Sequence, residues 1–110
     1  MNKELEIVCN ILNEKIASDI TIIDFDKHNP ICDYFVLATA KNYRHAYSLV
    51  DFTEEAVLKA GYDVKNIDAK KDAGWLILDL DDIVVHIFLE EERSKYQLER
   101  LWQDFHITKM

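Results

Sequence analysis

The chain has 110 residues, with 13 basic and 21 acidic side chains, so its formal net charge is −8 at pH 7. This length supports one hydrophobic core and is short for two, and a hydrophobic fraction of 49% excludes a disordered chain. The acidic balance excludes a nucleic-acid backbone as the main source of binding affinity and favours a basic protein partner.

Residues 1–110 are therefore expected to form a single domain. No apolar run approaches the roughly 20 residues that span a bilayer, and the N-terminus lacks a basic region followed by an apolar one. We expect a cytoplasmic protein that makes no membrane contact. Cys9 and Cys32 lie far apart without the spacing of metal ligands, which favours reduced thiols.

The first half of the chain predicts one helix and two strands. Apolar residues recur at helical spacing over 5–16, and Ser18-Asp19 looks like the break after this helix. A β-branched run at 20–25 predicts a strand, which the polar turn 26–30 separates from a second strand at 33–39. Because the connection is short, the two strands are expected to be antiparallel neighbours.

The second half predicts a longer helix, a hairpin and a final helix. Asn42 is a suitable N-cap for a helix that ends at Gly61, and 62–67 predicts a short strand. Two strong strands follow within 75–88, and a last helix covers 90–105. The sequence thus predicts an α/β fold in the order α-β-β-α-β-β-β-α, with a mixed sheet of about five strands and helices packed on one face.

The hairpin is the most informative segment because its two faces differ in chemistry. A tight turn at Leu80 and Asp81 pairs Trp75 with His86, Ile77 with Val84, and Asp79 with Asp82, and places these six residues on one face. The other face is wholly apolar and consists of Leu76, Leu78, Ile83, Val85 and Ile87. Because that apolar face must be buried, the face with Trp75 and His86 is predicted to be an exposed docking surface for a partner.

An alternative is a magnesium-dependent nucleotide-handling enzyme of the nucleotidyltransferase type. It would use four carboxylates, Asp24, Asp26, Asp79 and Asp82. Such an enzyme also needs an element that cradles phosphate, and neither Gly61 nor Gly74 opens a helix with a following serine. The four histidines are dispersed without metal-ligand spacing. We therefore expect no catalytic residue, no bound metal and no cofactor.

The last predicted helix carries residues with structural roles. Arg93, Tyr96 and Glu99 fall close to one face, where a salt bridge or hydrogen bond would anchor the helix. Trp102 is predicted to be a core or dimer-contact residue.

Several runs resemble one family when they are taken together. They are 74–79, 82–88, Arg93, Tyr96, 98–99 and 101–102, with 33–39 and Arg44-His45 upstream. In this order they resemble the ribosomal silencing factors, also called Iojap-like proteins, over nearly the whole chain. The combination is specific even though no single motif is.

The resemblance implies a nucleotidyltransferase-type fold without its catalytic set. It further implies a noncatalytic translation repressor that binds large-subunit ribosomal protein L-fourteen and sterically blocks joining of the two ribosomal subunits. Trp75, Leu80 and His86 are the implied contacts, with Asp79 and Asp82 beside them. We also expect a homodimer when the protein is free, because an apolar sheet face tends to be covered by self-association.

One departure from the family pattern affects the hairpin. Asp81 stands where glycine is usual in the turn, and aspartate accepts a positive φ less readily than glycine. A turn that opened for this reason would change the register between Trp75 and His86.

Overall fold

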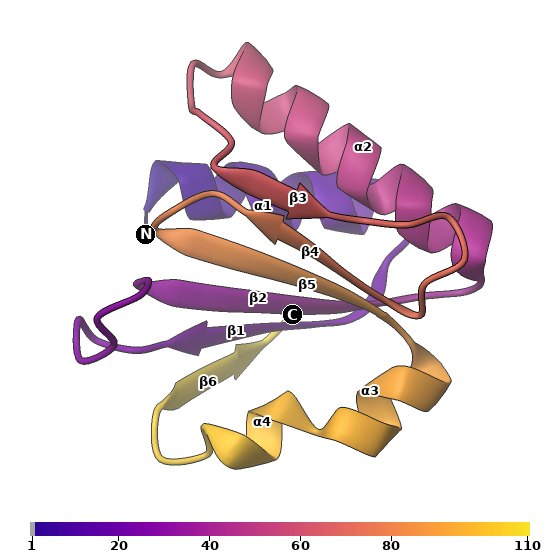
Figure 1. Cartoon of the computed structure of the whole chain (residues 1–110). Coiled ribbons are helices and arrows are strands. Elements are labelled where there is room, and N and C mark those ends of the chain that lie inside the picture. The colour runs from indigo at the N-terminus through magenta and orange to yellow at the C-terminus, as the bar shows by residue number, and fades with distance from the viewer. Residues whose placement is uncertain (1) are drawn as a thin grey trace.

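The computed structural model describes residues 2–110. The elements are α1 (Lys3–Glu14), β1 (Ser18–Asp24), β2 (Tyr34–Ala40), α2 (Tyr43–Lys59), β3 (Asn66–Asp68), β4 (Trp75–Asp79), β5 (Ile83–Leu89), α3 (Glu90–Tyr96), α4 (Leu98–Leu101) and β6 (His106–Lys109). The strands form one six-stranded sheet in the order β3-β4-β5-β2-β1-β6 (Figure 1). Strands β2 and β5 are parallel and the other neighbours are antiparallel. The predicted α/β class with a mixed sheet is confirmed.

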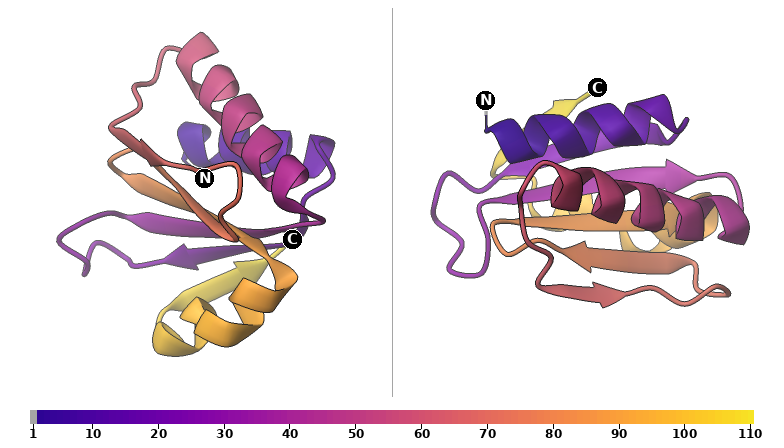
Figure 2. Two further views of the ribbon diagram at one scale, coloured as in Figure 1. Left: turned by 45° about the vertical axis from the view of Figure 1, so that its right-hand side comes forward. Right: turned by 90° about the horizontal axis from the view of Figure 1, so that it is seen from above.

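The helices form two layers, one on each face of the sheet (Figure 2). Helices α1 and α2 cover one face, as predicted. Helices α3 and α4 cover the other face, where Leu98 and Trp102 pack against a second apolar cluster. The sequence predicted helices on one face only, because the amphipathic pattern of the C-terminal segment does not say which side of the sheet it meets.

The C-terminal segment differs from the single helix predicted over 90–105. Gln97 has a left-handed φ of 47°, which ends α3 and separates it from α4. The chain then returns as β6, an edge strand that pairs with β1. Strand β6 was not predicted because three of its four residues are polar or exposed and only Ile107 is partly buried.

The N-terminal elements follow the predicted local signals. The Asn42 side chain accepts a hydrogen bond from the His45 backbone N–H at 2.8 Å, which caps α2, and Gly61 follows the helix with a φ of 92°. Strands β1 and β2 are antiparallel neighbours, as their short connection predicted.

The main core lies between α1, α2 and the sheet. The apolar face of the predicted hairpin contributes five side chains that are fully buried, Leu76, Leu78, Ile83, Val85 and Ile87. Burial of each such side chain contributes about 1.5–3 kcal/mol relative to exposure. The prediction that this face is buried under helices is confirmed.

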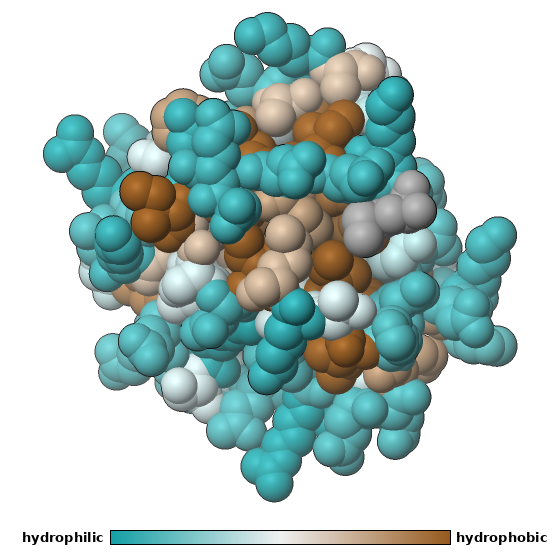
Figure 3. Space-filling model, turned by 180° about the vertical axis from the view of Figure 1, so that it is seen from behind, coloured by the Kyte–Doolittle hydropathy of each residue, from teal (hydrophilic) through white to brown (hydrophobic). Residues whose placement is uncertain are grey.

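The face of the molecule that points away from the viewer in Figure 1 is mostly hydrophilic at its margin. Figure 3 shows hydrophobic residues as small patches in the middle of this face, with hydrophilic side chains between and around them. Within residues 2–110, no helix has the length and apolar character needed to cross a bilayer.

Helix α1 ends in a Schellman motif that places a β-branched residue in an unfavourable conformation. The Ala17 N–H donates to the Leu12 carbonyl at 3.0 Å and the Ile16 N–H donates to the Asn13 carbonyl at 3.1 Å. Ile16 therefore adopts a φ of 68°, although its side chain is 65% exposed and buries little in return.

We predict that Ile16→Gly raises the free energy of unfolding by about 1 kcal/mol, because glycine adopts positive φ without the Cβ penalty. Urea denaturation of both proteins measures the change. Lys15→Gly is the matched control, since Lys15 has an ordinary φ of −93° and glycine there should not stabilise. Equal effects of the two substitutions would contradict the assignment of strain to Ile16.

Candidate functional site

The β4–β5 hairpin forms with a register that differs from the predicted one by two residues. Trp75 pairs with Phe88, Ile77 with His86, and Asp79 with Val84. The predicted pairs of Trp75 with His86, Ile77 with Val84 and Asp79 with Asp82 are therefore wrong.

The reason lies in the turn. Asp81 takes a φ of 77°, and the Leu80 N–H donates to the Ile83 carbonyl at 2.8 Å, so Asp81 and Asp82 are the central turn residues. The turn stays tight despite the absence of glycine. A shift of two residues keeps every strand side chain on its predicted face, and only Asp82 leaves that face for the turn.

The face with Trp75 and His86 is largely covered, which contradicts the prediction that both rings are exposed. His86 is 5% exposed, and Trp75 is partly buried. Leu80, the third residue expected at the contact, is 4% exposed and packs in the main core on the other face of the sheet. The Tyr96 ring of α3 lies 4.8 Å from the Trp75 ring, centroid to centroid. Sequence patterns missed this cover because the hairpin alone does not show that α3 and α4 fold back over it.

His86 and Trp75 are joined by a hydrogen bond that fixes the orientation of the indole. Trp75 Nε1 donates to His86 Nδ1 at 3.1 Å, so the neutral imidazole carries its proton on Nε2. Burial lowers the pKa of His86 from 6.5 to about 4 and keeps the ring uncharged at neutral pH. Nε2 has no hydrogen-bond partner in the part of the chain that the structure describes.

The part of this face that remains accessible runs along β4 to the turn. Trp75, Ile77 and Asp79 alternate on one side of β4 and are each partly buried, and Asp82 in the turn is exposed. We call these four residues the hairpin strip. It combines two apolar side chains with two carboxylates on a rigid strand and its turn, which suits the recognition of a basic protein surface.

Two of the four carboxylates in the alternative hypothesis accept hydrogen bonds from backbone N–H groups in turns. The Asp24 side chain accepts from the Asp26 N–H at 2.8 Å, and the Asp79 side chain accepts from the Asp81 N–H at 2.9 Å. Within residues 2–110, no three His, Cys, Asp or Glu side chains are grouped so that they could hold a metal ion. The structure therefore does not assemble Asp24, Asp26, Asp79 and Asp82 into one cation site.

The two cysteines are free and buried. Burial raises the pKa of each thiol, Cys9 and Cys32, to about 11. Both side chains are therefore neutral thiols at physiological pH, and neither has the lowered pKa of a reactive cysteine.

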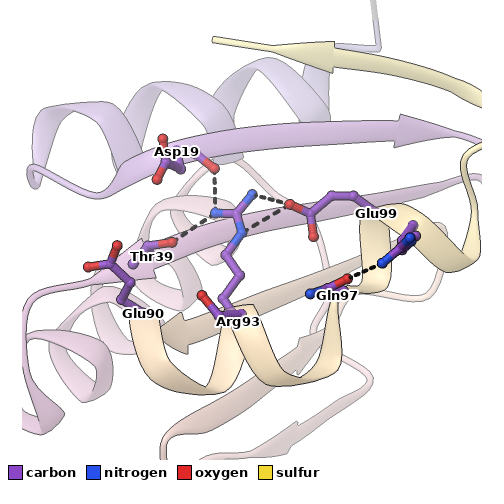
Figure 4. A pocket seen from close by; sticks show the side chains of 8 residues that line it. Asp19, Thr39, Glu90, Arg93, Gln97 and Glu99 are labelled. Atoms are coloured by element: carbon purple, nitrogen blue, oxygen red, sulfur yellow. Dashed lines mark hydrogen bonds and ion pairs between the residues drawn. The ribbon is translucent and has the colours of Figure 1, made fainter.

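A polar cavity of about 350 Å³ surrounds Arg93, between α3, α4 and the ends of β1 and β2 (Figure 4). The Arg93 guanidinium donates twice to the Glu99 carboxylate, at 2.9 and 3.2 Å, as the spacing of these residues predicted. It also donates to the Asp19 carbonyl and to the hydroxyls of Thr39 and Thr21. These contacts use all five guanidinium N–H groups, so Arg93 attaches the C-terminal helices to the sheet and has no free donor for a ligand.

Together the fold and this surface define a mixed-sheet α/β protein with a candidate docking strip. Comparison with known proteins makes the assignment more specific. A family model described as "Ribosomal silencing factor during starvation", RsfS, matches residues 1–109. The chain belongs to this family.

Individual relatives agree with this assignment. The chain is 31% identical to the ribosomal silencing factor RsfS of Bacillus subtilis over 100 residues, which cover 91% of this chain and 85% of the relative. It is 29% identical to a mouse protein named "Mitochondrial assembly of ribosomal large subunit protein 1", over 90% of this chain and 45% of the mouse protein. A crystal structure from Chromobacterium violaceum, 24% identical in sequence, shares the fold with a TM-score of 0.88 over 94% of this chain and 88% of that one.

We predict that the free energy of unfolding falls as the pH is lowered from about 6.5 to 4, because His86 is neutral in the folded state while the unfolded chain takes up the proton. This one proton contributes a slope of up to about 1.4 kcal/mol per pH unit. Urea denaturation between pH 7 and pH 5 measures it. His86→Phe should be less stable at pH 7 and should lose this part of the slope, and an unchanged slope would contradict the assignment.

We predict that Arg93→Gln lowers the free energy of unfolding by about 3 kcal/mol, because it leaves the partly buried Glu99 carboxylate without its cation. Thermal or urea denaturation measures the loss. Arg100→Gln is the control, since Arg100 is exposed and its one side-chain hydrogen bond among residues 2–110 goes to the Gln97 side chain. A similar loss in both variants would show that Arg93 makes no special contribution.

Proposed function

We propose that this protein is a noncatalytic translation repressor that binds the large ribosomal subunit through ribosomal protein L-fourteen and blocks joining of the small subunit. The family match over residues 1–109 carries this proposal. The curated bacterial relatives are named as ribosomal silencing factors, and the name of the mouse relative refers to assembly of the large subunit.

The hairpin strip is the proposed contact surface. Trp75 is a large ring held in one orientation by His86, and aromatic anchors of this kind supply much of the energy of protein interfaces. Asp79 and Asp82 place negative charge beside it, which complements a basic ribosomal protein. The two buried residues expected at the contact, His86 and Leu80, act from inside by supporting the indole and the turn.

Such a factor needs no reaction to act. A rigid body bound over the subunit-joining face of a ribosomal protein excludes the small subunit by its volume. The net charge of −8 disfavours ribosomal RNA as the main contact, since like charges repel the phosphate backbone.

We predict that Trp75→Ala weakens binding to L-fourteen by about 2 kcal/mol or more, on the scale of an interface hot spot. Asp82→Lys should also weaken binding, because it reverses the charge of an exposed side chain in the turn. Co-sedimentation with purified large subunits and titration of isolated L-fourteen measure both effects. When small subunits are added to the same samples, the fraction of assembled ribosomes should decrease with the parent protein and return towards its original value with the variants.

Phe52→Ala is the matched control. Phe52 is an aromatic residue on α2, on the opposite face of the sheet, and is 39% exposed. Urea denaturation of Trp75→Ala separates lost packing on Tyr96 and Phe88 from lost binding. Folded Trp75→Ala and Asp82→Lys variants that bind as tightly as the parent would refute the hairpin strip as the contact.

A further inference from the structure

A second surface on this molecule has the form of a groove with one apolar part and one acidic part. The apolar part is a cavity of about 310 Å³ between the β1–β2 connection and the segment after α4. Figure 1 shows both connections at the same end of the sheet. Pro30 and Ile31 form one wall, and Phe35, Trp102 and Phe105 form the rest. Ile31 is 74% exposed, so the wall that it forms is open to a partner.

The acidic part adjoins the apolar part and shares His28 and Phe105 with it. It is a cavity of about 500 Å³ that is lined by three acidic residues, Asp24, Asp26 and Asp104, together with His106. None of these carboxylates lies within ion-pair distance of a cationic side chain anywhere in residues 2–110. Three acidic groups without a cation therefore lie directly beside an apolar slot.

The groove is held in shape by its own contacts. The Phe25 ring lies beneath it and makes edge-to-face contacts with Phe35, Trp102 and Phe105, with centroid distances of 4.9 to 5.1 Å. The loop wall is fixed by the Asn29 side chain, which accepts from the Ile31 N–H at 2.8 Å. A preformed slot loses little conformational entropy when it binds a ligand, so ordering of the loop does not weaken the affinity.

We propose that this groove binds a segment of a basic protein in which one bulky apolar side chain adjoins lysine or arginine residues. The apolar side chain fills the slot beside Trp102 and Phe105. The neighbouring cation pairs with the carboxylates of Asp26 and Asp104. The groove and the hairpin strip share no residue, although Phe35, Trp102 and Phe105 pack in the same apolar cluster as Trp75 and Ile77. The proposal does not depend on binding to L-fourteen.

Charge decides between this occupant and the other candidates. A second copy of the chain in a two-fold dimer would bring the same acidic rim against itself, and like charges across an interface are unfavourable. A nucleic acid would bring phosphates to three unpaired carboxylates. A cationic segment with an apolar anchor is the occupant that satisfies both parts of the groove.

The test uses the whole protein with Trp75→Phe as background, so that Trp102 is its one remaining tryptophan. The probe is a short acetylated peptide with a central leucine flanked by lysines. Two matched peptides replace the leucine with serine or the lysines with glutamate. We expect the leucine–lysine peptide to shift the Trp102 fluorescence in a saturable manner, and each matched peptide to bind at least tenfold more weakly.

Variants of the protein locate the effect. Ile31→Ser and the double variant Asp26→Asn with Asp104→Asn should each weaken peptide binding at least tenfold. Asparagine suits position 26, where φ is 50°. Two controls make the same changes at exposed positions outside the groove. Leu58→Ser on α2 matches Ile31→Ser, and Asp51→Asn with Asp63→Asn matches the double variant. These controls should bind as the parent does.

Three results would overturn the proposal. The first is equal binding of the lysine and glutamate peptides, or of the groove and control variants. The second is a dimer, seen by analytical ultracentrifugation, that Ile31→Ser converts to a monomer, since this would identify a second copy as the occupant. The third is saturable binding of single-stranded oligouridylate at the groove in place of the peptide. Binding of L-fourteen to the Ile31→Ser variant tests the two surfaces separately.

Discussion

Strand β5 is buried on both of its faces, and this constraint determines where the other layers of the molecule lie. Its residues from Ile83 to Phe88 are all buried, so helices must cover the sheet above and below it. Helices α1 and α2 meet one side, and the α3–α4 segment meets the other. The accessible surface of the hairpin is consequently confined to the turn and to one side of β4, whose residues are buried on one face only.

The sequence predicted local structure well where a single residue type determines the backbone. Asn42 and Gly61 bound α2 as expected, and the apolar face of the hairpin is buried. It failed where the answer depends on distant parts of the chain. The alternation along β5 puts His86 on the face opposite Val85, but only the returning helices decide whether that face meets water. The predicted register is wrong because it places the turn at Leu80 and Asp81, whereas the positive φ of Asp81 belongs to the first of the two central positions.

The candidate site shows the same division. The residue set predicted for partner binding contained the exposed Asp82 and the partly buried Trp75 and Asp79, and it also contained Leu80 and His86, which are buried. The groove beside Trp102 was not predicted at all. Its walls come from residues near 30 and near 105, and no periodicity within either segment indicates that they meet. A clue was present in Ile31, an apolar residue between the polar turn and the second strand that no strand or helix pattern accounts for.

The Arg93 contacts join positions that are far apart in the chain, since its guanidinium reaches the Asp19 carbonyl 74 residues earlier. Strand β6, near residue 107, likewise pairs with β1, near residue 21. Both sets of contacts that complete the second layer therefore join segments that lie far apart in the sequence. Loop-closure entropy must be overcome before such contacts stabilise the chain, so we expect the surface built by the C-terminal segment to order late in folding.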